Sequence, residues 1–89
     1  MLMSGHEFWA LKATHGIALD FIIEELFEAG IYPKWDEVLL AAKADGVNIQ
    51  KLVRELKMYF ESVCKEELRS RMILMIDKLY EKMVKDAKI

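Results

Sequence analysis

Residues 49–83 read IQKLVRELKMYFESVCKEELRSRMILMIDKLYEKM and contain neither Gly nor Pro. On a helix of about 3.6 residues per turn, most apolar side chains of residues 49–64 lie on one side. Most of those of residues 68–83 lie nearly opposite, and the change of side falls in the charged segment 65–71. Either one long helix packs its two halves against different neighbours, or the chain reverses near residues 65–70. The absence of helix-breaking residues favours a continuous or merely kinked helix.

Three shorter helices are predicted before this stretch, over residues 5–15, 17–29 and 34–45. A glycine follows the second and the third, and Gly30 and Gly46 each fit the left-handed position that ends a helix. Asn48 is then a suitable N-cap for the fourth helix. The sequence therefore predicts an all-α, bundle-like fold with a long C-terminal helix, of four helices or of five if the chain reverses.

The 89 residues are predicted to form a single helical domain, residues 1–89, with a compact helical unit at 1–64 and a partner-binding segment at 65–89. The run from Met72 to Ile76 is apolar on every side of a helix and needs neighbours on more than one side. Self-association in a twofold homodimer supplies them most simply. The candidate interface residues are Leu68, Met72, Ile73, Met75, Ile76, Leu79 and Met83.

Composition excludes several classes of protein. A net charge of −2 argues against a protein that coats nucleic acid generally. The longest apolar run is five residues, whereas a membrane-spanning helix needs about 20, so no membrane partner is expected. No signal peptide is predicted at the N-terminus. The single cysteine, Cys64, cannot form an internal disulfide, and a cytoplasmic location is expected.

Side chains that carry chemistry are few. His6 and His15 are nine residues apart, so they do not share one helix face, and no zinc-binding helix motif is present. Cys64 has no nearby histidine and lies among apolar residues, as a core cysteine does. The sequence therefore predicts no catalytic residue, no metal ligand and no cofactor.

A basic face on the fourth helix points to a different function. Its polar and basic residues lie opposite the apolar stripe, and they are Gln50, Lys51, Arg54 and Lys57. They are suited either to an acidic protein surface, such as the row Asp20, Glu24 and Glu28, or to DNA phosphates and bases.

Contact with DNA is supported by residues 38–56, where Ala42, Gly46, Val47 and Leu52 have the spacing of a small residue, a turn glycine and two apolar residues. This segment resembles the core of a helix-turn-helix motif. The resemblance implies that Gly46 makes the turn and that Gln50, Lys51 and Arg54 face DNA.

Three functions follow in order of preference. The first is a non-enzymatic helical module that binds another protein, either a second copy of itself or another helical protein. The alternative is a helix-turn-helix DNA-binding transcriptional regulator that uses the 47–58 helix and dimerises through its C-terminal segment. The third is a helical protein that holds a metal at Glu24 and Glu28, or a small ligand among Phe8, Trp9, Phe21 and Trp35.

Overall fold

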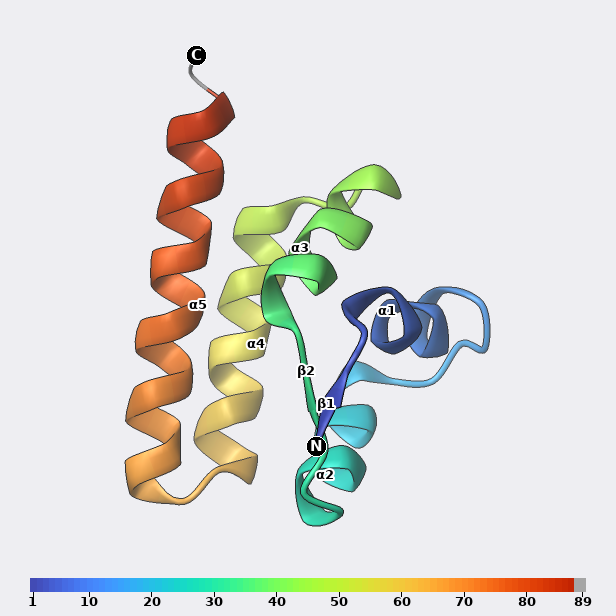
Figure 1. The fold of residues 1–89 in the computed structure, drawn as a ribbon, viewed down its shortest axis with the longest axis vertical. Helices are drawn as coiled ribbons and strands as arrows, with labels where there is room; N and C mark the ends of the chain where they lie inside the picture. The colour runs from blue at the N-terminus through green and yellow to red at the C-terminus, as the bar shows by residue number, and fades with distance from the viewer. Residues whose placement is uncertain (88–89) are drawn as a thin grey trace. The chain divides into compact units, whose positions relative to one another are not determined.

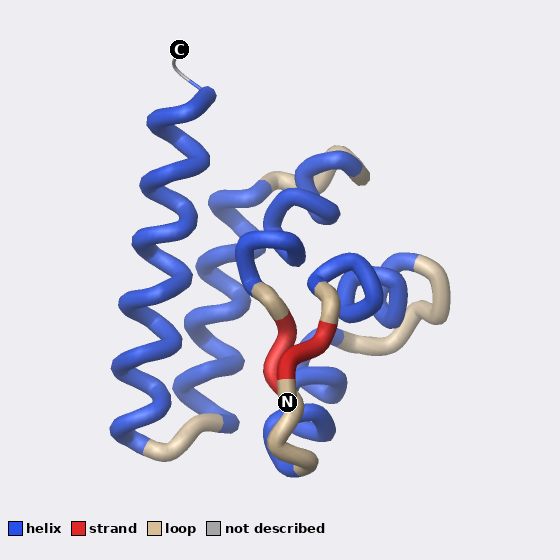
Figure 2. Tube along the Cα trace, viewed as in Figure 1, coloured by secondary structure: helices blue, strands red, loops and turns tan. Residues whose placement is uncertain are grey.

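The computed structural model describes residues 1–87 as five helices and two short strands (Figure 1). In chain order these are β1 (Leu2–Met3), α1 (Gly5–Ala13), α2 (Leu19–Glu28), β2 (Tyr32–Pro33), α3 (Trp35–Ala44), α4 (Ile49–Val63) and α5 (Glu66–Ala87). Helices predominate (Figure 2), and the prediction of an all-α fold is confirmed. Each of the first three helices begins and ends within two residues of its predicted bounds.

The chain forms two compact units, Met1–Val47 and a second that begins at Asn48. The sequence places the internal division later, after residue 64. In the structure α4 packs against α5, and these two helices form the second unit together.

Two glycines end helices in the first unit as their positions predict. Gly30 has φ of +73°, and the N–H of Ile31 after it donates to the carbonyl of Leu26 at 2.8 Å. Gly46 has φ of +82°, and the N–H of Val47 donates in the same way to a carbonyl of α3 at 3.1 Å. Both are Schellman closures, which satisfy carbonyl groups that the end of a helix leaves without partners.

The first unit also contains a parallel strand pair that the sequence does not predict. β1 and β2 pair with Leu2 beside Tyr32 and Met3 beside Pro33 (Figure 2). The N–H of Tyr32 donates to the carbonyl of Met1 at 2.9 Å. The pair thereby ties the start of the chain to the segment between α2 and α3.

The core of the first unit lies largely where α1 packs against α3. The rings of Phe8 and Trp35 meet edge to face, with centroids 5.2 Å apart, a favoured geometry for aromatic pairs. Beside them, Nε1 of the Trp9 indole donates to the Asp45 carboxylate at 2.6 Å, at the end of α3. Further buried side chains of this unit are Leu19, Ile22, Ile23, Val38, Leu39 and Ala42.

The second unit is a helical hairpin, so the prediction of a continuous helix over residues 49–86 is wrong. α4 ends at Val63, and Cys64 has an extended backbone with φ of −86° and ψ of 145°. A new helix begins at Glu66 and runs beside α4 (Figure 1). Glu66 and Glu67 occupy its first turn, where negative charge is stabilised by the positive end of the helix dipole.

Chain reversal explains why the apolar face changes side. On a straight helix Leu56 and Phe60 would face one way and Met72 and Ile76 the other. Because α5 folds back along α4, all four side chains are buried. A single change of the apolar face along the sequence is thus what two antiparallel helices of one chain produce. It does not by itself require a second chain.

Candidate interaction surface

The predicted interface residues fall into two groups in the structure. Met72 and Ile76 are buried within the chain, because they lie on the inner side of α5. The others are half-buried, so part of each side chain stays accessible; these are Leu68, Ile73, Met75, Leu79 and Met83. Met72 and Ile76 therefore serve the core of the hairpin, and an interface on α5 would use the residues of this helix that remain accessible.

One apolar residue of α5 faces away from that core. Leu74 is 57% exposed, and it lies two residues, or about 200° of helix rotation, from the fully buried Ile76. Leu74 is absent from the predicted interface because it lies off the apolar stripe. The sequence does contain its signal, since the run Met72–Ile76 is apolar on every side of the helix.

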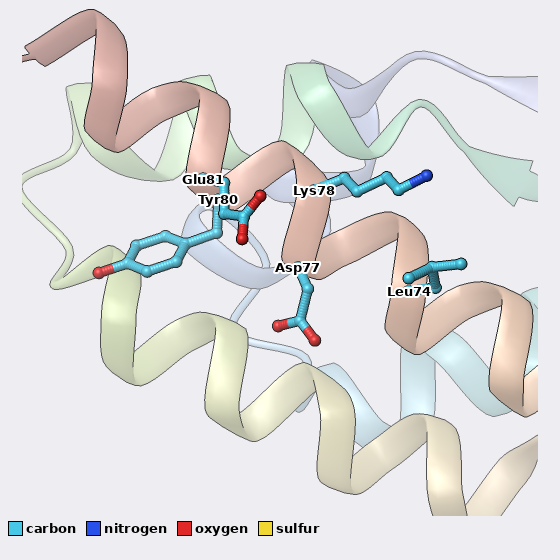
Figure 3. Close-up of a pocket in the computed structure, with 5 residues that line it drawn as sticks. All are labelled: Leu74, Asp77, Lys78, Tyr80 and Glu81. Atoms are coloured by element: carbon cyan, nitrogen blue, oxygen red, sulfur yellow. The ribbon is translucent and has the colours of Figure 1, made fainter.

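Leu74 borders an open hollow along α5. Five side chains of this helix line the hollow (Figure 3), and they are Leu74, Asp77, Lys78, Tyr80 and Glu81. Asp77 points toward α4, whereas Lys78 extends on the side away from α4. Because one helix supplies all the lining residues, the hollow is a surface depression that suits the side chains of a partner rather than an enclosed small molecule.

An ion pair joins the two helices of the hairpin beside this hollow. The Lys57 ammonium on α4 contacts the Asp77 carboxylate on α5. Both side chains are partly exposed, and such pairs contribute only about 0–1 kcal/mol to stability. Lys57 is one of the four polar and basic residues that the sequence offers as candidates for DNA contact, and this ion pair engages it within the chain.

The other three residues of that set are accessible. Gln50, Lys51 and Arg54 are exposed on α4, and their side chains form no ion pair within residues 1–87. Asn48 caps this helix, with its side-chain oxygen accepting from the N–H of Lys51 at 3.1 Å. The N-terminal half of α4 therefore presents a polar and basic face to solvent.

Cys64 is a free, buried cysteine. Burial raises the pKa of its thiol, and this outweighs the opposing effect of the nearby Arg69 charge. A raised pKa keeps the thiol protonated near neutral pH, and the neutral thiol is a poor nucleophile. This environment suits a core cysteine, as predicted.

Candidate ligand residues do not converge. Within residues 1–87 no three His, Cys, Asp or Glu side chains lie close enough together to hold a metal ion, Glu24 and Glu28 included. Of the four aromatic residues considered for a ligand site, Phe8, Trp9 and Trp35 are buried in the core, and Phe21 is exposed on α2.

Comparisons with protein families, with curated proteins and with solved structures find no match to this chain. Within the described residues, no helix combines the length and the apolar character that crossing a membrane requires.

Proposed function

We propose that this protein is a non-enzymatic helical interaction module that binds another helix through α5, and that its first partner is a second copy of itself. The observation that carries the proposal is the incomplete burial of α5. Among the side chains described for this 22-residue helix, only Met72 and Ile76 are buried. Seven other apolar or aromatic residues are half-buried and Leu74 is exposed; the seven are Leu68, Ile73, Met75, Leu79, Tyr80, Met83 and Val84.

This composition fits a protein interface better than a catalytic site. Interfaces combine apolar and aromatic contacts with a polar rim. Leu74 and Tyr80 supply apolar and aromatic surface at the hollow, and Asp77, Lys78 and Glu81 surround it with charge. At about 1.5 Å per residue, α5 is roughly 33 Å long, which is long enough for a helix–helix contact of several turns.

Sedimentation equilibrium tests the proposal. The wild-type protein is expected to shift from the mass of one chain toward the mass of two as its concentration rises from about 10 to 500 μM, a range that suits a small, partly polar interface. Leu74→Lys should keep the protein monomeric across this range, because the introduced ammonium would be desolvated in the interface.

Leu40→Lys is the matched control, since Leu40 is 55% exposed on α3, nearly as much as Leu74 on α5. It introduces the same charge and should leave the dimer intact. A wild-type protein that stays monomeric at 500 μM would refute self-association. Equal effects of the two substitutions would show that α5 is not the interface.

DNA binding is a second candidate, and the exposure of Gln50, Lys51 and Arg54 on one face of α4 favours it. Fluorescence anisotropy of a random-sequence duplex should then rise with protein at about 50 mM salt and fall steeply at 200 mM, because phosphate contacts release counterions. Arg54→Glu should abolish the binding, whereas Lys82→Glu, an identical charge change on α5, should weaken it much less. Absence of binding at both salt concentrations would refute this candidate.

A cytoplasmic location belongs to the same proposal. Its support is chemical, since Cys64 is a free thiol held in the core, and a reducing compartment keeps such a thiol from oxidation.

A further inference from the structure

The outer side of α5 carries a regular series of exposed residues. Successive members are separated alternately by four and three positions. This spacing keeps them on one side of the helix, as in helices that pair along their length. All six are exposed, and they are Glu67, Arg71, Leu74, Lys78, Glu81 and Lys85. This set, the outer series, includes three of the residues that line the hollow.

The charges of the outer series have no partner within the described chain. The ion pair found there joins Lys57 to Asp77, and neither residue belongs to the series. Glu67 and Arg71 are four residues apart on one helix, yet they are not joined in an ion pair. The five charged members are therefore available to an external partner.

The order of these charges is self-complementary when the helix meets an antiparallel copy of itself. Three pairs of positions are centred on residue 76, namely 67 with 85, 71 with 81, and 74 with 78. In that register Glu67 faces Lys85 of the second copy, and Arg71 faces Glu81 of the second copy. Leu74 faces the aliphatic stem of Lys78 of the second copy, which can cover apolar surface while its ammonium stays in water.

We infer that α5 pairs with α5 of a second copy in an antiparallel arrangement, about a twofold axis at the level of Ile76, through the outer series. This inference rests on the proposed function and specifies its partner and register. Twofold symmetry repeats each contact, so two kinds of ion pair give four ion pairs in the dimer. Each kind joins opposite charges.

Other arrangements bring like charges together. In a parallel, in-register pair each residue would meet its own counterpart, so Glu67, Arg71 and Glu81 would each face an identical charge. An antiparallel pair centred on residue 74 would bring Glu67 against Glu81 of the second copy. Like-charge contacts disfavour these two alternatives. The register centred on residue 76 is favoured further because it places four of the five charged members of the outer series opposite a residue of opposite charge.

The apolar part of the contact lies close to the axis. Leu74 is two residues from the centre of the series, and the half-buried Met75 lies on the flank beside it. Rotation about the twofold axis brings the same flank of each helix together, so Met75 of one copy approaches Met75 of the other. Exposed ion pairs are weak individually, and the dimer is therefore expected to be weak and to dissociate further as salt rises.

A charge-exchange experiment tests the pairing. Arg71→Glu alone and Glu81→Arg alone should each raise the dimer dissociation constant by at least about tenfold, because each creates two like-charge contacts. An equimolar mixture of the two variants should form a heterodimer, since Glu at 71 in one chain then meets Arg at 81 in the other. The double variant Arg71→Glu/Glu81→Arg should dimerise like the wild type. Analytical ultracentrifugation measures all four samples.

The outcomes separate this inference from the proposal on which it rests. If the wild type dimerises and Leu74→Lys disrupts it, but the single charge variants do not, then α5 is the interface and the register is wrong. If both single variants disrupt the dimer and neither the mixture nor the double variant restores it, the register is also wrong. If the wild type does not dimerise, both proposals fail. Circular dichroism of each variant confirms that these exposed substitutions leave the helices folded.

Discussion

Replacing Ile76 with Glu is expected to abolish cooperative folding of the second unit at neutral pH. Ile76 is fully buried in the α4–α5 hairpin, and an ionised carboxylate there would lose its water without gaining a partner. Leaving an unpaired charge in a core costs about 3–5 kcal/mol, against a total stability of roughly 5–13 kcal/mol for a chain of this size. Far-ultraviolet circular dichroism during urea titration should show a much lower midpoint or no transition.

Leu74→Glu is the matched control for this prediction. It places the same charge on the same helix two residues away, at a side chain that is 57% exposed, so the free energy of unfolding should change by no more than about 0.5 kcal/mol. If Ile76→Glu also folded as stably as the wild type, Ile76 would not be buried. The hairpin would then be wrong, and a single long helix would again explain the sequence.

The ends of α2 and α3 and the start of α4 were predictable because local signals mark them. Gly30 and Gly46 both adopt the positive φ that their positions predict, and Asn48 caps α4 through its side chain. Signals of this kind act over a few residues and depend little on the rest of the fold. Bounds set by such residues can therefore be predicted from sequence with small errors.

The break between α4 and α5 was not predictable in the same way. No Gly or Pro lies there, and Cys64 adopts an extended backbone that its residue type does not require. Glu66 and Glu67 are a local signal for the start of a new helix, but glutamate is also favourable in the interior of a helix. Whether the helix stops at this point or continues through it is decided by the packing of α5 on α4, which is a tertiary effect. The β1–β2 pair was missed because strands of two residues show no alternation.

For the candidate surface, sequence periodicity identified the apolar face of α5 but not what covers it. Met72 and Ile76 were predicted for a partner and are covered by the chain itself, whereas Leu74 was omitted and is exposed. Similarly, Lys57 belongs to the predicted basic face, yet Asp77, twenty residues later, engages it. Contacts between α4 and α5 exist only because the chain reverses. Which residues are buried, exposed or paired can therefore be assigned only once the hairpin is known.

Gly5→Ala is expected to destabilise the first unit strongly. A Cβ at Gly5 would lie 2.6 Å from the backbone carbonyl carbon of Glu37 and closer still to the backbone nitrogen of Val38. Neither backbone atom can move without shifting α3 away from α1. The shift would also disturb the bond that the Gly5 N–H donates to Oε1 of Glu37 at 2.8 Å. Overpacking of this kind costs about 1–3 kcal/mol or more, and thermal denaturation should show a clear fall in Tm.

Gly16→Ala separates this steric effect from the effect of adding a methyl group to any glycine. Gly16 has φ of +68°, and a Cβ added there would meet nothing within 4 Å, so alanine costs only the strain of a left-handed backbone, about 1–2 kcal/mol. Gly5 has no positive φ, and its entire cost comes from the close approach of α1 to α3. Gly5→Ser should therefore be at least as harmful as Gly5→Ala, because serine adds a further atom at the same place. If Gly5→Ala were instead neutral or stabilising, α1 and α3 would not be in close contact at this point, and the packing of the first unit would need revision.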